Sequence, residues 1–219
     1  MTEQATRQLR ISEIFLSLQG ETSTVGLPTV FVRLTGCPLR CHYCDTAYAF
    51  SGGEVMTLED ILARVRDLGV RRVTVTGGEP LAQPDCLGLL TSLCDEGFAV
   101  SLETSGALDV AGVDERVVKI IDVKTPGSGE VSRNRWENLA HCADGDQFKF
   151  VICHREDYEW ARLKCEEHKL FEGACEVLFS PSSAELPARD LADWIVRDRL
   201  PVRMQIQLHK YLWGDQPGR

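Results

Sequence analysis

Three cysteines near the start of the chain have the spacing of a loop that binds an inorganic centre. Cys37, Cys41 and Cys44 stand in the segment CPLRCHYC, which is a C-x3-C-x2-C pattern. Gly36 and Pro38 favour an irregular loop that can wrap around a metal group. Three thiolates suit a four-iron, four-sulfur (4Fe–4S) cluster in which one iron stays open to an exogenous ligand. The sequence therefore predicts that chemistry occurs at that open iron.

A structural zinc site is the other use of such thiols, and it needs four ligands to close its tetrahedron. His42 lies between two of the cysteines, where it is poorly placed to complete the same tetrahedron. An iron–sulfur cluster is therefore favoured over zinc. The remaining cysteines match no cluster or zinc spacing, and we expect each to be a buried, inert thiol: Cys86, Cys94, Cys142, Cys153, Cys165 and Cys175.

The composition is that of one globular domain in a reducing compartment. The chain has 219 residues, of which 43% are hydrophobic and 26% charged, so we expect a single domain over 1–219. The sequence contains no run of about 18 apolar residues that could span a membrane and no secretory signal at its start. These features predict a cytoplasmic protein that does not bind membranes. The net charge of −9 argues against non-specific binding to nucleic acid.

Short β-branched runs alternate with helical periodicity along the chain. The pattern predicts strands over 11–18, 29–34, 73–76, 98–102, 117–123, 148–152, 176–179 and 202–208, and helices over 57–68, 85–95, 156–168 and 189–199. The polar segment 125–146 is expected to be a loop with at most one short helix, at 133–142. Strands that alternate with helices form a parallel sheet. Because only about six such units fit into the chain, we expect an α/β fold with a partial, open βα barrel.

Unusual sequences follow several of these strands. They are TGGEP at 76–80, ETSG at 103–106, DVK at 122–124 and SPSS at 180–183. In parallel sheets the ligand site lies at the carboxyl ends of the strands, so these motifs and the cysteine loop should meet at one edge. Gly77 and Gly78 would let the backbone approach a ligand closely.

The cysteine loop together with GGEP at 77–80 resembles the radical S-adenosylmethionine (SAM) superfamily. An aromatic residue before the third cysteine, here Tyr43, belongs to that signature. The resemblance implies that the methionine part of SAM chelates the open iron of a 4Fe–4S cluster. It also implies that the reduced cluster splits the sulfonium and yields a 5′-deoxyadenosyl radical. All-thiolate clusters reach the low potentials that this cleavage needs.

Further segments are similar to the 7-carboxy-7-deazaguanine synthase family, and the likeness covers nearly the whole chain. They are SLQGET (17–22), FVRLTGC (31–37), CDTAY (44–48), VTGGEPL (75–81) and QLHKYLW (207–213). The resemblance implies a lyase that converts 6-carboxy-5,6,7,8-tetrahydropterin to 7-carboxy-7-deazaguanine by radical ring contraction with loss of ammonia, in queuosine and 7-deazapurine biosynthesis. It further implies catalytic use of SAM, a Mg²⁺ requirement, a homodimer and a low-potential electron donor such as flavodoxin or ferredoxin.

The resemblance also implies roles for the residues at matching positions. Cys37, Cys41 and Cys44 would hold the cluster, and the hydroxyl of Thr46 would bind Mg²⁺, a hard cation that prefers oxygen ligands. No side chain would act as a catalyst, because the radical forms on SAM. The substrate would contact Leu18, Gln19, Gly20, Arg33 and Thr76, with the Arg33 guanidinium paired to the substrate carboxylate. The positions expected to line SAM are Tyr43, Gly78, Asp122, Val123, Lys124, Ser180, Pro181, Ser182 and Ser183.

Three features depart from some relatives. The first two cluster cysteines have the short superfamily spacing, DVK replaces the SPK of some relatives, and GDQPGR continues past Trp213, so no C-terminal contact is carried over. Taken one at a time, Arg33 could be a strand-edge charge, Thr46 a turn hydroxyl and His209 a core histidine. An enzyme that makes a glycyl radical on a protein partner would share the cluster and GGEP, but would not require SLQGE or CDT. A structural or electron-transfer metalloprotein would leave the strand-end motifs unexplained.

Overall fold

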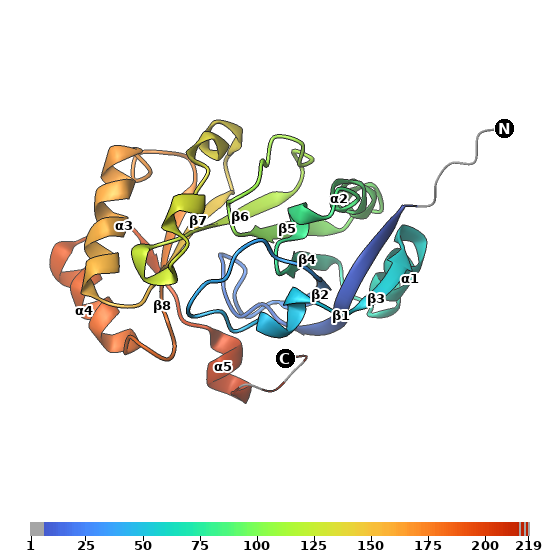
Figure 1. Cartoon of the computed structure of the whole chain (residues 1–219), viewed down its shortest axis with the longest axis horizontal. Coiled ribbons are helices and arrows are strands. Elements are labelled where there is room, and N and C mark those ends of the chain that lie inside the picture. The colour runs from blue at the N-terminus through green and yellow to red at the C-terminus, as the bar shows by residue number, and fades with distance from the viewer. Residues whose placement is uncertain (1–6, 215, 217, 219) are drawn as a thin grey trace.

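The computed structural model describes residues 7–214, 216 and 218, and it contains one nine-stranded sheet. Figure 1 shows the elements in chain order. The strands are β1 (Gln8–Leu18), β2 (Pro28–Leu34), β3 (Glu54–Thr57), β4 (Arg72–Gly77), β5 (Ala99–Thr104), β6 (Val118–Val123), β7 (Gln147–Ile152), β8 (Glu176–Pro181) and β9 (Arg203–Met204). The α-helices are α1 (Leu58–Asp67), α2 (Cys86–Asp95), α3 (Arg155–Glu167), α4 (Ala188–Asp198) and α5 (Leu208–Trp213).

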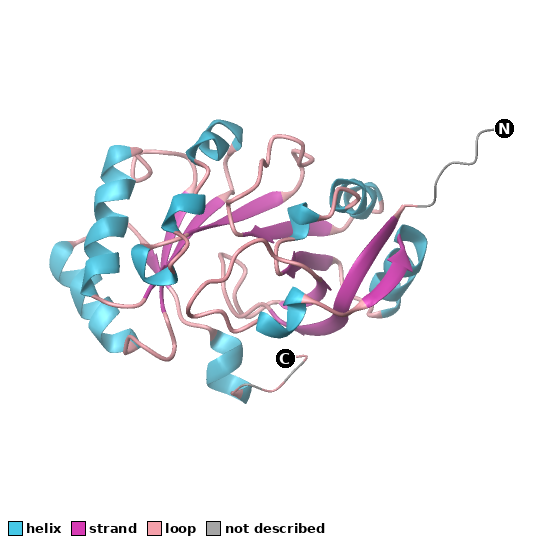
Figure 2. Cartoon of the chain, viewed as in Figure 1, coloured by secondary structure: helices cyan, strands magenta, loops and turns pink. Residues whose placement is uncertain are grey.

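The sheet is mostly parallel and is not closed. Its strand order is β3-β1-β2-β4-β5-β6-β7-β8-β9, so β3 and β9 are the two edges among the described residues. Neighbours from β2 to β9 pair in parallel, whereas β1 pairs antiparallel with both β2 and β3. The helices lie around the periphery and loops occupy the centre of the view in Figure 2. The prediction of a partial, open βα barrel is therefore confirmed.

The helices form where the apolar spacing predicts them. In α1, Ile61, Leu62 and Val65 are buried on one face, and the Thr57 hydroxyl accepts a hydrogen bond from the Asp60 amide at 3.2 Å. This N-cap satisfies a free amide in the first helical turn. One apolar cluster packs α1 and α2 against β1 to β5, and a second packs α3 and α4 against β6 to β8. No helix among the described residues is long and apolar enough to cross a bilayer.

The prediction of a strand over 202–208 is wrong for most of its length. Only Arg203 and Met204 pair with β8, and the chain then turns into α5. Burial does not follow the apolar alternation here, because the polar Gln205 is buried and the apolar Ile206 is exposed. After the Gln205 amide, which still donates to the Phe179 carbonyl at 3.0 Å, the backbone leaves the sheet. The Leu208 amide instead donates to the Gly20 carbonyl at 2.9 Å. The alternation of apolar and polar residues in this segment therefore reports neither a strand nor the burial of its side chains.

Two further differences concern loops and thiols. Segment 125–146 holds the 3₁₀ turns η3 (Pro126–Ser128), η4 (Val131–Arg133) and η5 (Trp136–His141), which is more than the one short helix expected. The described thiols are all free, but the prediction of burial is wrong for Cys142 and Cys175, which are half-buried. They lie in the loops just after η5 and just before β8, where they pack against the edge of the second apolar cluster. A hydrogen bond from Cys142 lowers the pKa of the Cys175 thiol.

Candidate active site

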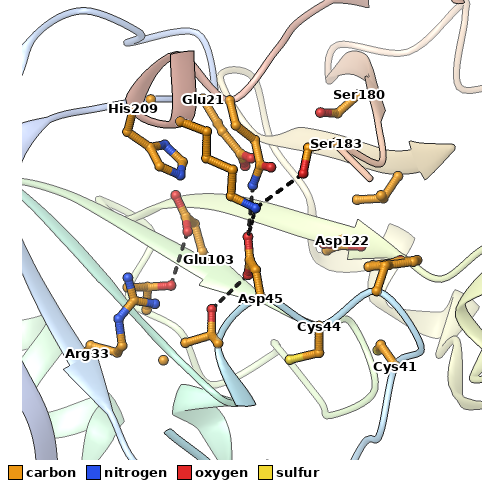
Figure 3. Close-up of a pocket in the computed structure, with 18 of the residues that line it drawn as sticks. Glu21, Arg33, Cys41, Cys44, Asp45, Glu103, Asp122, Ser180, Ser183 and His209 are labelled. Atoms are coloured by element: carbon orange, nitrogen blue, oxygen red, sulfur yellow. Dashed lines mark hydrogen bonds and ion pairs between the residues drawn. The ribbon is translucent and has the colours of Figure 1, made fainter. Parts of the chain in front are cut away.

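A cavity of about 800 Å³ opens at the carboxyl ends of the parallel strands. All of the predicted site residues except Val123 line it, including the cysteine loop, the end of β1, Thr76 and Gly78 after β4, and Ser180–Ser183 after β8. Figure 3 shows Arg33 and Glu103 to one side of Asp45, and Cys41, Cys44 and Asp122 to the other. Val123 is buried in the apolar cluster of α3 and α4, because alternate side chains of β6 point away from the cavity.

The cysteine loop follows β2 and is held by backbone hydrogen bonds from three directions. The Gly36 amide donates to Ala49, the Glu79 amide donates to Gly36, and the His42 amide donates to Ser128, at 2.8 to 3.0 Å. Gly36 has a φ of 99°, a conformation that glycine adopts without strain. These hydrogen bonds hold the loop so that its three half-buried thiols line the cavity.

The donor set fits a 4Fe–4S cluster. His42 is exposed and its Nε2 lies 3.1 Å from Glu185, so it is not turned toward the thiols as a fourth ligand. No three His, Cys, Asp or Glu side chains of the described residues converge on a single-ion site. A cube with four irons places its thiolates on separate metal atoms, so such convergence is not needed. Burial raises the pKa of Cys41 to about 11, and the positive charge of Lys124 opposes that shift.

Gly78 is required where β4 meets the cysteine loop. A Cβ atom at this position would lie 2.8 Å from the Cβ of Cys37 and would overlap the Gly36 carbonyl. Only glycine lets the two segments approach this closely, which explains the second glycine of GGEP. The two segments that carry the cluster thiols and the candidate SAM contact are thus in direct contact.

Buried charges of alternating sign cross the floor of the cavity. Lys124 lies 3.0 Å from Asp122, Lys149 lies 3.8 Å from the other Asp122 oxygen, and Lys149 also pairs with Glu21. Burial alone would lower the pKa of Lys124, but the nearby charges of Asp122 and Cys41 raise it. Both lysines therefore stay protonated. Positive charge close to the cysteine loop favours its thiolates and an anionic ligand group.

Glu103 is a cavity residue to which sequence reasoning assigned no role. Its two carboxylate oxygens accept from Gln19 Nε2 at 3.3 Å and from the Thr76 hydroxyl at 3.0 Å. It therefore joins two residues that the resemblance placed at the substrate. Burial raises the pKa of Glu103, and the charge of Lys149 opposes this. The available signal was its place in ETSG, directly at the end of β5.

Glu79, the acidic residue of GGEP, has a structural role: its carboxylate is hydrogen-bonded within the protein. It is fully buried and accepts from the Thr104 hydroxyl at 2.9 Å, from the Ser105 amide at 2.7 Å and from the Leu81 amide at 3.0 Å. It does not line the cavity. Its carboxylate ties the end of β4 to the end of β5, and so fixes where Gly78 and Glu103 lie relative to one another.

Arg33 and Thr46 face the cavity from β2 and from the turn after the cysteines. Glu13 binds the Nε of Arg33 at 2.7 Å and also accepts from the Tyr48 hydroxyl at 2.8 Å. This contact fixes the position of the Arg33 guanidinium, which lines the cavity. The Thr46 hydroxyl donates to Asp45 at 2.9 Å, so its lone pairs stay free for a cation.

α5 and the residues after it cover part of the same cavity. His209 packs against Gly20, and Gly214, Gln216 and Gly218 also line the cavity. Burial lowers the pKa of His209, although the charges of Glu21 and Asp45 oppose this, so the imidazole is neutral at pH 7. The interpretation of His209 as a core histidine is wrong. The sequence also assigned no contact to the tail, which the structure places at the cavity.

Comparison with known proteins identifies this arrangement. The radical SAM superfamily matches residues 31–125. The chain is 48% identical to 7-carboxy-7-deazaguanine synthase of Chlorobaculum tepidum, over 94% of each chain, and 42% identical to that of Koribacter versatilis, over 94% of this chain and 97% of the relative. The chain belongs to the 7-carboxy-7-deazaguanine synthase family. QueE from Escherichia coli has a similar structure, with a TM-score of 0.75 and 25% identity, over 91% of this chain and 94% of that one.

Membership of the 7-carboxy-7-deazaguanine synthase family confirms several predictions. The chain is a radical SAM enzyme of 7-deazapurine biosynthesis, and its cofactors are a 4Fe–4S cluster and SAM. It acts on a small molecule and needs a reductant. A structural zinc protein and a simple electron carrier are thereby excluded. The individual residue roles, Mg²⁺ and the oligomeric state are not settled by family membership and stay predictions.

Proposed function

We propose that the chain converts 6-carboxy-5,6,7,8-tetrahydropterin to 7-carboxy-7-deazaguanine and ammonia. The curated relatives carry the name of that product's synthase. The observation that carries the proposal is the polar array of Gln19, Thr76 and Glu103 beside Arg33 in a cavity that also holds the cysteine loop. Ammonia is the only other product, so the conversion involves no net oxidation. A hydrogen atom taken from the substrate is returned, and SAM acts catalytically.

Gln19, Thr76 and Glu103 suit the pyrimidine edge of a pterin. That edge offers an amino group and a ring N–H as donors, together with a carbonyl acceptor. The Glu103 carboxylate accepts from donors, and the Gln19 amide both donates and accepts. Because Glu103 is half-buried and lines the cavity, a ligand that covers its carboxylate without donating to it leaves acceptor capacity desolvated and unused, which costs binding free energy. This penalty selects for a donor-rich heterocycle.

Arg33 and Thr46 suit the carboxylate side of the substrate. The guanidinium of Arg33 is held by Glu13 and offers its remaining N–H groups to an anion. The Thr46 hydroxyl would bind Mg²⁺, with waters and the substrate carboxylate completing a shell of oxygen ligands. Two positive groups on one carboxylate orient the ring against the cysteine loop.

At the other end of the cavity, Cys37, Cys41 and Cys44 would hold the cluster, and Gly78, Asp122, Lys124 and Ser180–Ser183 would hold SAM. When bound, the cluster and SAM supply the 5′-deoxyadenosyl radical. Lys124 places positive charge beside the loop, where the SAM carboxylate would approach. α5 and the tail residues at the cavity restrict access of water and so protect a reactive radical.

The reaction also requires an electron donor and a reducing compartment. The low potential of the cluster calls for a donor such as flavodoxin or ferredoxin, and the free thiols fit a reducing cytoplasm. The resemblance to the family further implies a homodimer. The net charge of −9 supports the absence of a nucleic-acid partner.

Anaerobic turnover tests the proposal. The reconstituted, reduced enzyme is incubated with SAM, Mg²⁺ and the carboxytetrahydropterin, and the deazapurine, ammonia and 5′-deoxyadenosine are measured by mass spectrometry and enzymatic assay. We expect many deazapurine molecules per deoxyadenosine released. Deoxyadenosine without deazapurine would contradict the assigned substrate. Cys41→Ala, which removes one cluster thiol, is the control that should abolish both products.

A further inference from the structure

A segment close to the end of the chain is bound to the turn that follows the cysteine loop. Lys210 Nζ lies 2.8 Å from Asp45 Oδ2, and Gln207 Nε2 donates to the same oxygen at 3.1 Å. Figure 3 shows these contacts converging on Asp45 in the middle of the cavity. Gln207 and Asp45 are 162 residues apart in the sequence.

The other oxygen of Asp45 determines how Thr46 is used. The Thr46 hydroxyl donates to Asp45 Oδ1 at 2.9 Å. A hydroxyl has one hydrogen and two lone pairs. Because the Thr46 hydroxyl donates its hydrogen to Asp45, both of its lone pairs can bind a cation. Because Lys210 and Gln207 both contact Oδ2, Oδ1 of Asp45 is left to accept the hydrogen bond from the Thr46 hydroxyl.

The same segment touches two other candidate ligand segments. Lys210 Nζ lies 3.5 Å from the Ser183 hydroxyl in the SPSS loop. The Leu208 amide donates to Gly20, and His209 packs against Gly20 at the substrate end. α5 therefore contacts the candidate substrate, cation and SAM segments at once.

We propose that Lys210, with Gln207, is a positioning residue that holds Asp45 and thereby aims the Thr46 hydroxyl at the divalent cation. Docking of α5 and cation binding are then coupled. The inference rests on the proposed function only in taking Thr46 as the Mg²⁺ ligand. The coupling is reciprocal by linkage, so the bound cation favours the docked α5 as much as the docked α5 favours the cation.

The test measures cation binding and α5 docking without turnover. Mn²⁺ replaces Mg²⁺ as the probe, and free Mn²⁺ is measured by EPR in the anaerobic enzyme with its cluster oxidised, SAM and the carboxytetrahydropterin present and no reductant. In Lys210→Met we expect the Mn²⁺ dissociation constant to rise about tenfold. Removal of a residue that orients a metal ligand has an effect of this size. Lys210→Arg keeps the charge and should restore most of the affinity.

Docking is measured by chymotrypsin cleavage at Tyr211 to Trp213. Tyr211 is exposed, so cleavage follows the opening of α5 rather than burial of that side chain. In Lys210→Met we expect cleavage roughly fivefold faster without any ligand, and loss of the protection that Mn²⁺ gives the unmodified enzyme. Arg203→Met breaks another surface ion pair, between Arg203 and Glu176 at 2.7 Å, and should change neither readout.

The outcomes separate this inference from the proposed function. If Lys210→Met binds Mn²⁺ as tightly as the unmodified enzyme, or if α5 is cleaved at an unchanged rate, the positioning role is overturned. If Arg203→Met weakens Mn²⁺ to the same extent, the effect is general and the role is likewise overturned. Failure of the unmodified enzyme to make the deazapurine would overturn the substrate assignment, while the cleavage assay still tests the Asp45–Lys210 contact.

Discussion

Glu79 and Glu103 are carboxylates at the ends of neighbouring strands, but their surroundings differ. Glu79 is fully buried and its oxygens accept from backbone and hydroxyl donors of the same domain. Glu103 lines the cavity, where Gln19 and Thr76 donate to it. A ligand can therefore compete for Glu103 but not for Glu79. Substitution of the two should affect different properties of the enzyme.

Glu103→Gln should weaken substrate recognition. The amide places donors where the substrate presents donors, and losing a hydrogen bond to a charged group lowers kcat/KM for the pterin by about 10- to 100-fold. The iron content and the cluster absorption spectrum should not change. Steady-state kinetics together with iron analysis check this. An unchanged kcat/KM would remove Glu103 from the substrate site.

The pH dependence offers a second test of Glu103. Its pKa is raised above the usual 4.5 by burial, so the carboxylate becomes protonated as the pH falls through that raised value. We expect kcat/KM to decline on the acid side at a pH higher than an ordinary glutamate would give. In Glu103→Gln this decline should disappear. A profile that keeps it in the variant would assign the titration to another group.

Glu79→Gln should act on stability. The amide turns a donor toward donors that the carboxylate accepted, which costs about 2 kcal/mol of folding free energy and lowers the melting temperature by roughly 4–8 °C. The measurement is thermal unfolding of the cluster-loaded enzyme followed by circular dichroism. A larger loss of pterin affinity than in Glu103→Gln would contradict this division of roles.

Thr46→Ala removes the proposed oxygen ligand and leaves the cluster thiols in place. The Mg²⁺ concentration for half-maximal activity should rise about tenfold, and Thr46→Ser should restore it because serine keeps the hydroxyl. Activity is titrated with Mg²⁺ at saturating substrate. A metal requirement that is the same in the alanine variant would assign the cation to other ligands.

At the scale of elements, the close contact between the cysteine loop and the turn after β4 determines where the cluster thiols lie. Gly36 accepts from the Glu79 amide at 2.8 Å, and Gly78 lies against Cys37 with no space for a side chain. Glu79 in turn holds β5. The cluster loop is therefore positioned by two strands that are far from it in sequence as well as by β2.

Gly78→Ala should displace the cysteine loop. The new methyl group overlaps Gly36 and Cys37, and relief of such overpacking requires a backbone shift. Iron and sulfide bound per chain after reconstitution should fall by about half or more. Gly173→Ala, where the nearest atom would be 3.7 Å away, is the control and should bind a full cluster. Full cluster loading of Gly78→Ala would show that the loop adapts.

At the scale of the whole molecule, the open sheet leaves room for the C-terminal segment. β9 is only two residues long, so the barrel ends there and α5 turns back to Gly20 at the end of β1. A closed barrel would place strands where α5 and the tail now meet the cavity. The two apolar clusters, one on each part of the sheet, stabilise the fold, and the cavity with its charged residues lies outside them at the strand ends.

Leu89→Ala tests whether the apolar clusters determine stability while the cavity residues determine activity. Leu89 is completely buried on α2, and the cavity left by its side chain should cost about 3 kcal/mol, or roughly 6–12 °C in melting temperature. Kinetic constants at 25 °C should change little. Val196→Ala, at an exposed position of α4, should change the melting temperature by less than about 2 °C. An equal loss in both variants would contradict the assigned core.

The sequence by itself determined the parallel sheet, the helices and the chemistry of the cysteine loop. Periodic apolar residues such as Ile61, Leu62 and Val65 report local burial directly, and thiol spacing within one loop is a local property. The motifs at strand ends also predicted one shared site, because parallel strands bring their carboxyl ends to one edge. These signals need no knowledge of which distant segments meet.

Only the tertiary structure decided the roles that depend on distant partners. The different surroundings of Glu79 and Glu103 and the contact of Lys210 with Asp45 arise between segments far apart in the chain. The false strand after Met204 has the same origin, because the chain there leaves β8 and turns toward Gly20 at the end of β1. Pairing is a property of two segments, and a single segment does not encode it alone.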